Sequence, residues 1–410
     1  GDAVAHLAFA TTTPPVAEED LTARLASILG IPSDATTWTY TGSTRAGGQA
    51  LDAALDAGPW GEQAGVVAVG DCPRGAPDSE QEHAAGAGSV AVVLDSDGPG
   101  AVLDRATHVE PYPGTRFRPA GATETTGLGI TQYDREAFRA ALGGARDGLS
   151  MAGPSVDAAA VQSPDGALPY RVADTLGVET AQIAAADTVT SLGDTGAASP
   201  LFGAAKAFDE GAKRVMLAAY GSGAGATVHV LDGPVPVEQS VAGEQSLTYA
   251  AYLRRRGEIT SGEPVGGGAY VSVPSWQRTL PQRHRLVAGR CRACSALQFP
   301  PDGACRACGN RAGYEPVELP GTGTVEATTT ISRGGAPPEF VEQTARSGPF
   351  AIAIVAFDGP EDGAVSLPAQ VVGEQSPAVG DRVEATVRRV YEQEGVVRYG
   401  YKVQLVDERR

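Results

Sequence analysis

Four cysteines in the last third of the chain have the spacing of a metal site. They form two Cys-x-x-Cys pairs separated by ten residues, Cys291 with Cys294 and Cys305 with Cys308. Each pair directs two thiolates toward one point, and two pairs complete a tetrahedral set of sulfur ligands that suits Zn²⁺. Because four protein thiolates fill the coordination sphere, the sequence predicts a structural zinc site with no open position for a substrate.

Two alternatives use the same four cysteines. Iron accepts the same four-thiolate geometry. Two disulfide bonds would need an oxidising compartment, and they are typical of short secreted chains rich in cysteine. This chain has 5 cysteines in 410 residues, and we expect no hydrophobic leader before its first strand. These features favour zinc and a reducing, cytoplasmic location.

The charge of the chain argues against two classes of partner. The formal net charge is −17 at pH 7, whereas nucleic acids and anionic membranes both attract positive charge. No apolar run in the sequence is as long as a membrane span. A hydrophobic content of 42% is typical of a globular protein. We therefore expect a globular chain with neither nucleic acid nor membrane as a partner.

The apolar pattern of the first half predicts an α/β fold. Short continuous apolar runs alternate with alanine-rich segments of helical period, as in sheets that are covered on both faces. Beyond an apolar start at residues 1–7, the expected strands are 64–70, 89–94, 156–161 and 215–220, and the expected helices are 18–29, 46–57, 134–142, 169–176 and 200–210.

The period changes to two after residue 313. Segments of alternating polarity are separated by Gly, Pro and Asp turns, which is the pattern of an all-β domain. Five strands of this length after a zinc ribbon indicate a small barrel of the OB type. The expected strands are 323–331, 350–357, 365–372, 382–390 and 399–406.

The second half resembles a family that accompanies thiolases and related acyl-CoA enzymes, a rubredoxin-like zinc ribbon followed by an OB-fold. The resemblance covers roughly residues 246–410 and includes a helix over 246–255. It implies a thiolase-family subunit as partner. The matching residues are the two cysteine pairs, Phe299–Pro301, Gly309, the turn Gly321–Val325 and the strand Phe350–Phe357.

The first half resembles hydroxymethylglutaryl-CoA synthases of the archaeal type. Four stretches carry the resemblance: 42–51, 162–173, 192–199 and 220–225. It implies a thiolase-like, layered α/β fold and acyl-CoA as ligand. The family's opening strand–helix–strand segment has no match, so we expect a thiolase-like fold that is incomplete at its N-terminus.

These patterns predict four parts along the chain. Residues 1–232 form the thiolase-like domain, and residues 233–288 form a linker that contains an anchoring helix and the glycine-rich stretch Gly262–Gly268. Residues 289–312 form the zinc ribbon, and residues 313–410 form the OB-fold domain.

The positions that carry the family's chemistry hold other residues here. The resemblance places Thr44 at the cysteine nucleophile, and a secondary alcohol is a poor substitute for a thiolate. Gln162 replaces a histidine and cannot titrate. Asp194 replaces an asparagine, and its charge would oppose a developing oxyanion. Thr11 falls near the expected carboxylate. We therefore expect no catalytic residues in this pocket.

Two groups of residues are candidates for binding coenzyme A. The resemblance implies that Gly221, Ser222 and Gly223 lie close to the pantetheine, although a tight β-turn alone would also explain these residues. Arg283 and Arg285 belong to the main basic concentration of the chain, and guanidinium groups suit phosphates. Ion pairs with acidic residues of the first half are the alternative.

The sequence favours a non-catalytic subunit that binds acyl-CoA and holds together a thiolase-type complex for C–C bond formation or cleavage. The expected partner is a catalytic thiolase-family subunit, in a hetero-oligomer. One alternative is an active acyltransferase with a non-standard base such as His83 or Asp194. The other alternative is a purely structural scaffold.

Overall fold

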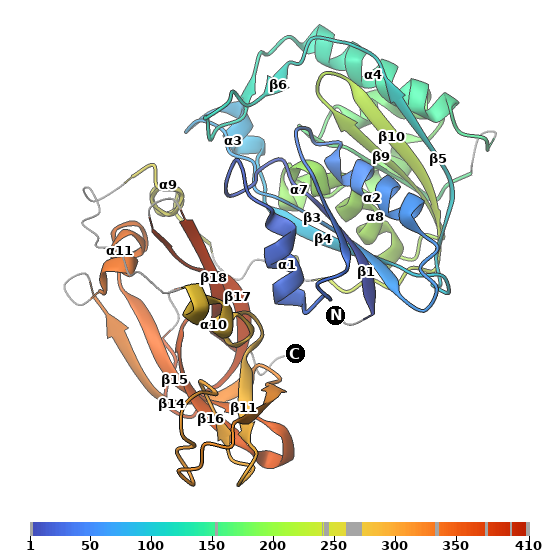
Figure 1. The fold of residues 1–410 in the computed structure, drawn as a ribbon. Helices are drawn as coiled ribbons and strands as arrows, with labels where there is room; N and C mark the ends of the chain where they lie inside the picture. Colours follow the sequence, from blue (N-terminus) through green and yellow to red (C-terminus); the bar gives the residue numbers. More distant parts are fainter. Residues whose placement is uncertain are drawn as a thin grey trace. The chain divides into compact units, whose positions relative to one another are not determined.

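The computed structural model (Figure 1) describes residues 3–151, 155–239, 241, 246–259, 273–332, 336–373, 376–393 and 396–406. The chain forms two compact units. The first comprises Gly1–Ala26 with Ile31–Gly243, and the second comprises Ser27–Gly30 with Glu244–Arg410. Within the described residues, no helix has both the length and the apolar character needed to cross a membrane.

The first unit is built on two four-stranded sheets, with strand orders β2-β1-β3-β4 and β5-β10-β9-β8. In the first sheet β1, β2 and β3 are parallel and β4 is antiparallel, while in the second sheet β8 is parallel to β9 and the other pairs are antiparallel. The strands are β1 (Val4–Ala10), β2 (Thr36–Tyr40), β3 (Ala64–Asp71), β4 (Gly88–Leu94), β5 (Ala101–Val109), β8 (Ala158–Val161), β9 (Arg214–Gly221) and β10 (Gly225–Asp232), with a separate small pair β6 (Arg116–Phe117) and β7 (Thr126–Gly127).

Two helices, α2 (Ala46–Ala57) and α8 (Ser199–Asp209), lie between the sheets (Figure 1). Their alanines share one buried core with small side chains of both sheets. On the far side of the second sheet α4 (Thr131–Asp147) packs its buried Phe138 into another core. The other helices before residue 210 are α1 (Leu21–Leu29), whose last three residues belong to the second unit, α3 (Glu80–Ala84), η1 (Pro169–Val172), α5 (Ala173–Leu176), α6 (Thr180–Ala185), α7 (Val189–Leu192) and η2 (Gly196–Ala198).

Small residues allow α2 to lie close to its neighbours on both sides. A Cβ atom on Gly47 would overlap the carbonyl oxygen of Ala197, and one on Gly48 would lie 2.9 Å from the Cβ of Ala219. Glycine costs a helix about 1 kcal/mol relative to alanine. The close packing of α2 therefore explains why two adjacent glycines occur within a helix.

The second unit contains a three-stranded sheet, β12-β11-β13, and a five-stranded sheet, β16-β15-β14-β17-β18. A parallel bridge from Val371 to Val403 brings the two edges of the larger sheet together, so that it forms a nearly closed barrel around Phe357 and Leu367. The elements are α9 (Tyr249–Arg256), α10 (Val273–Arg285), β11 (Val287–Cys291), β12 (Leu297–Gln298), β13 (Tyr314–Glu318), β14 (Thr322–Ile331), η3 (Pro338–Phe340), α11 (Val341–Ser347), β15 (Phe350–Asp358), η4 (Pro360–Asp362), β16 (Ala364–Gln370), β17 (Arg382–Gln393) and β18 (Val396–Leu405).

The structure confirms the predicted fold class, a layered α/β unit followed by a zinc ribbon and a five-stranded barrel. The expected strands and helices are present, with α2 at the predicted bounds. The strands that were not expected from the sequence are β2, β5, β6, β7 and β10 in the first unit and β11, β12 and β13 in the second. The four-part division of the chain stays a prediction, and Gly262–Gly268 lies outside the described residues.

We expect Gly47→Ala to destabilise the first unit. The added methyl group gains helix propensity but must displace the backbone at Ala197, and such overpacking costs about 1–3 kcal/mol. Thermal denaturation followed by circular dichroism should show an earlier transition. Ala57→Ser, at an exposed position of the same helix, is the control and should leave the transition in place. A Gly47→Ala variant as stable as the parent would contradict this packing argument.

Candidate functional site

The four predicted metal ligands meet at one point in the second unit. Their sulfur atoms all lie within 4.8 Å of one another, with 3.8 Å from Cys291 to Cys308 and 3.7 Å from Cys294 to Cys305. A tetrahedral site with Zn–S bonds of about 2.3 Å has sulfur–sulfur edges of about 3.8 Å. The cysteines therefore fit the zinc site that their spacing predicts.

Two backbone turns hold the sulfur atoms in place. The Ser295 amide donates to the Cys291 carbonyl over 2.8 Å, and the Gly309 amide donates to the Cys305 carbonyl over 2.7 Å. Each turn thus closes around one Cys-x-x-Cys pair. With four thiolates as ligands, the metal would bridge the two turns and supply the folding energy of the ribbon.

The first unit contains a cavity of about 280 Å³. Its lining includes four residues that the sequence singled out, Thr44, Gln162, Asp194 and Ser222. The fold thus brings together residues from four separate segments of the chain. Thr11, Gly221 and Gly223 are not part of the lining. The catalytic and coenzyme A roles assigned from the sequence stay predictions.

Thr44 lies in the turn before α2 and lines the cavity. Its hydroxyl donates a hydrogen bond of 2.6 Å to the backbone carbonyl of Tyr220, at the end of β9. A backbone carbonyl accepts this hydrogen bond, but it is too weak a base to remove the proton from the hydroxyl group. In this arrangement the hydroxyl is therefore not activated as a nucleophile.

Gln162 and Asp194 are both anchored to Gly196. The Gln162 Nε2 donates to the Gly196 carbonyl over 2.8 Å, and the Gly196 amide donates to Asp194 Oδ1 over 2.9 Å. Asp194 also forms an ion pair with Arg116. Burial raises the pKa of Asp194, and the Arg116 guanidinium and the Gly196 amide oppose this rise. Both side chains are almost completely buried.

Thr11 does not line the cavity and instead binds the buried carboxylate of Asp71. The Thr11 hydroxyl donates to Asp71 Oδ1 over 2.9 Å, and the Ala197 amide donates to Asp71 Oδ2 over 2.7 Å. The Thr12 and Thr13 amides and hydroxyls also donate to this carboxylate. Thr11 therefore helps to order the backbone around the cavity.

The glycine-rich stretch forms the hairpin between β9 and β10. Gly221 pairs with Gly225, and residues 222–224 make the turn. A Cβ atom on Gly221 would lie 2.5 Å from the Ser43 hydroxyl, so glycine lets the hairpin approach the turn that carries Thr44. The Ser222 hydroxyl accepts a hydrogen bond of 3.2 Å from the Arg116 amide.

Several charged residues of the cavity were not expected from the sequence. Arg116, on β6, comes from a segment with no recognisable pattern, and Asp134 lies in the first turn of α4. Burial and the nearby charge of Asp165 raise the pKa of Asp134. Burial, together with Asp134, also raises the pKa of Tyr220 to about 12. Three further arginines line the cavity: Arg74, Arg135 and Arg171.

The predicted phosphate-binding arginines belong to the second unit. Arg283 and Arg285 lie at the end of α10, and the Arg285 guanidinium is 3.5 Å from a carboxylate oxygen of Glu318. Their role in coenzyme A binding stays a prediction.

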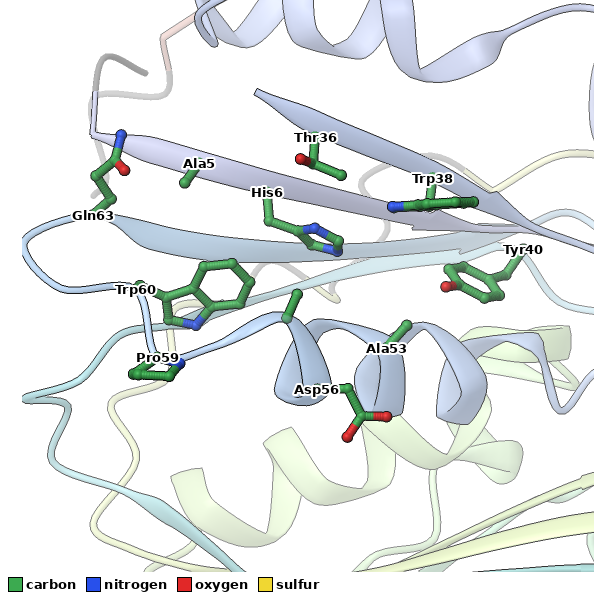
Figure 2. Close-up of a pocket in the computed structure, with 11 residues that line it drawn as sticks. Ala5, His6, Thr36, Trp38, Tyr40, Ala53, Asp56, Pro59, Trp60 and Gln63 are labelled. Atoms are coloured by element: carbon green, nitrogen blue, oxygen red, sulfur yellow. The ribbon is translucent and has the colours of Figure 1, made fainter. Parts of the chain in front are cut away.

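A groove of about 580 Å³ lies beside the edge strand β2 and the last turns of α2. Figure 2 shows the rings of His6, Trp38, Tyr40 and Trp60 along this aromatic groove. Trp38 is 56% exposed, whereas His6 is 2% exposed and its ring nitrogens have no hydrogen-bond partner among the described residues. Burial lowers the pKa of His6. The sequence signal for this groove is the alternating segment Thr36–Tyr40, which was not singled out.

Comparison with known families identifies the second unit. The family model of the rubredoxin-like zinc ribbon domain of ChsH2 matches residues 278–313, and that of the C-terminal OB-fold domain of ChsH2 matches residues 316–388. A DUF35 domain-containing scaffold protein of Methanocaldococcus jannaschii is 32% identical over 139 residues, which cover 33% of this chain and 91% of that protein.

The first unit is similar to hydroxymethylglutaryl-CoA synthases. The synthase of Pyrobaculum neutrophilum is 28% identical over 264 residues, which cover 60% of this chain and 75% of that enzyme. The synthase of Methanopyrus kandleri is 28% identical over 268 residues, which cover 61% of this chain and 73% of that enzyme. The crystal structure of a hydroxymethylglutaryl-CoA synthase complexed with CoA shares the fold, with a TM-score of 0.51 and 16% identity. The match covers 67% of this chain and 78% of that structure. These similarities confirm both resemblances found in the sequence.

We expect Cys294→Ser to remove the metal, because three thiolates and a hydroxyl form a much weaker zinc site. Elemental analysis should find about one zinc per chain in the parent protein and much less in the variant. Limited proteolysis should then cut within residues 289–312. Cys72→Ser is the matched control, since Cys72 is an exposed cysteine of the first unit. Absence of zinc from freshly purified parent protein would refute the assignment.

Proposed function

Through its last third the chain belongs to the family of DUF35 domain-containing scaffold proteins, and on this basis we propose that it is an acyl-CoA-binding subunit of a thiolase-type complex. In this complex a separate thiolase-family subunit forms or cleaves the C–C bond. Two features of the chain support the proposal: similarity to a protein named as a scaffold, and a first unit similar to enzymes that are named for a CoA thioester.

The hydrogen bond from Thr44 to Tyr220 is the observation that carries the non-catalytic role. A nucleophile needs a base within hydrogen-bond reach, and the Thr44 hydroxyl instead donates to a backbone carbonyl. Gln162 cannot transfer a proton at neutral pH. Both observations support a binding role for the cavity rather than a catalytic one.

The cavity offers guanidinium groups to an anionic ligand. Arg74, Arg135 and Arg171 line it, although acidic side chains of the lining match the arginines in number. Guanidinium groups bind phosphates and carboxylates through paired hydrogen bonds. A volume of about 280 Å³ is far more than a single water molecule needs, so the cavity has room for part of a small ligand.

The edge strand β2 and the aromatic groove are where we propose that the catalytic subunit docks. Among the described residues β2 pairs only with β1, and its segment Thr36–Tyr40 contains no proline or charged residue that would block another strand. Trp38 offers a large exposed aromatic surface on this edge. An edge strand of the partner would pair with the β2 backbone and cover Trp38. The result would be a hetero-oligomer.

A second candidate function is an active acyltransferase that uses Asp194 as the base. The raised pKa of this buried carboxyl group favours it, because a carboxylate with a raised pKa is a stronger base than an ordinary one. The ion pair with Arg116 argues against it. His83, the other candidate base, is exposed beside Asp78 and does not line the cavity.

We expect Thr44→Ala to leave the activity of the assembled complex within about threefold, roughly 0.6 kcal/mol of transition-state energy. Asp194→Asn tests the alternative, because it preserves size and removes the carboxylate. Under the proposed function it should change kcat by less than about tenfold. A loss of several hundredfold in either variant would assign chemistry to this cavity and would overturn the non-catalytic role. Steady-state kinetics of the purified complex, with the parent chain and with each variant, measures these changes in activity.

We expect the chain to be aggregated when it is produced alone and soluble when it is co-expressed with a thiolase-family subunit from the same organism. Obligate interfaces bury about 2,000–5,000 Å². Trp38→Glu should weaken the complex at least tenfold, because it places a charge in the docking surface. Tyr133→Glu, which changes an exposed aromatic residue of α4, should not. Light scattering and co-purification measure assembly. If the chain produced alone is a soluble monomer and binds no such subunit, the proposal is wrong.

A further inference from the structure

Lys402, on β18, has no acidic partner among the described residues. The chain contains three lysines. Lys206 lies 3.8 Å from a carboxylate oxygen of Glu210, and Lys213 is exposed close to Asp157. Lys402 is only partly exposed, and its nitrogen forms no hydrogen bond or ion pair with another described residue. Unlike the buried side-chain atoms that lack a partner, this nitrogen keeps contact with solvent.

Two arginines of the neighbouring strand β17 lie close to Lys402. Lys402 pairs directly with Thr386, so their Cβ atoms are about 4.5–5.5 Å apart. Arg388 lies on the same face of β17 as Thr386 and donates to its hydroxyl over 2.7 Å. Arg389 is the next residue of the strand. Burial lowers the pKa of Lys402 to about 8, and the charges of Arg389 and Arg388 add to this effect.

The carboxylates of this region are bound to other groups. Glu384 lies on the same face of β17 and accepts a hydrogen bond of 2.6 Å from Gln404, while Glu392 lies 3.1 Å from the Arg389 guanidinium. The two other elements that pack against β18, α10 and β16, contain no acidic residue. Helix α10 instead contributes basic residues: Arg278, Arg283, His284 and Arg285. Among the described residues, Lys402 therefore lies in surroundings that disfavour its charged form.

A neutral lysine amine is a nucleophile toward activated acyl groups. At pH 8 about half of the Lys402 amine is neutral, against well under about 1% for a lysine of ordinary pKa near 10.4. Its nitrogen would attack the carbonyl carbon of the donor and form a C–N bond, while the bond from this carbon to sulfur or to a phosphate oxygen breaks. The electron pair leaves with the thiolate or phosphate, and the amine releases its proton to solvent.

The neighbouring arginines favour this reaction in two ways. Guanidinium groups bind phosphates through paired hydrogen bonds, so Arg388 and Arg389 can attract a donor that carries phosphate. The amide product is neutral, so acylation also removes the repulsion between the Lys402 ammonium and the two guanidinium groups.

We propose that Lys402 is a modification site, a nucleophilic amine that takes up acyl groups from phosphate-bearing donors such as acyl phosphates and coenzyme A thioesters. The site lies on the barrel of the second unit and is separate from the cavity of the first. The inference does not depend on the proposed function. Acylation would remove one positive charge from this face of the barrel.

Acetylation of the full chain tests this site, because the three lysines can be compared within one sample. The chain, as purified alone or with a partner subunit, is incubated at pH 8 with acetyl phosphate or acetyl-CoA. It is then digested with a protease that does not cut at lysine and analysed by mass spectrometry. Lys402 should be acetylated at least about tenfold faster than Lys206 and Lys213, because more of its amine is neutral. In chain unfolded by urea the three rates should become similar. A preference seen with one donor alone identifies that donor as the source of the acyl group.

A double variant tests the role of the arginines. Arg388→Gln combined with Arg389→Gln removes both guanidinium groups and should reduce the preference for Lys402 at least about threefold. Arg139→Gln, the same change at an exposed position of α4, is the matched control and should leave the preference unchanged. Equal rates at the three lysines of the folded parent chain, or a preference that persists in urea, would overturn the inference and leave the proposed function standing. The comparison within the parent chain decides even if the double variant does not fold.

Discussion

The shape of the cavity depends on the hydrogen bonds to the buried carboxylate of Asp71. This carboxylate accepts hydrogen bonds from the loop Thr11–Thr13 after β1 and from the Ala197 amide in η2. A buried charge is costly unless hydrogen bonds compensate for it, so these donors and the carboxylate hold one another in place. The same turn contains Gly196, to which Gln162 and Asp194 are bound. The geometry of the cavity thus depends on a residue that does not line it.

Much of the fold follows from local patterns in the sequence. The Cys-x-x-Cys spacing sets the metal site, and the apolar runs in β3, β4 and β9 are long enough to be recognised as buried strands. Strand β5 was missed because Arg105 and Thr107 interrupt its apolar pattern. The reason appears only in the folded chain, where Arg105 pairs with Asp52 of α2. A strand whose inner face meets a polar helix face does not have the alternation of a half-buried strand.

The candidate site was likewise predicted only in part. Resemblance to a family located Thr44, Gln162 and Asp194, and the structure brings them into one cavity. Their partners could not be predicted, because the Arg116 ion pair and the Gly196 backbone contacts join segments far apart in the chain. The aromatic groove was missed for a related reason: His6, Trp38 and Trp60 lie on three segments that become neighbours only in the folded sheet.

The distribution of the cysteines has a practical consequence for spectroscopy. Four of the five cysteines are zinc ligands by their geometry, and Cys72 stands alone and exposed after β3. The next two residues, Pro73 and Arg74, line the cavity. In the zinc-loaded protein a thiol-reactive fluorophore or spin label would therefore attach at one position, at the rim of the cavity. The native sequence thus carries a single reporter site for following ligand entry without an engineered cysteine.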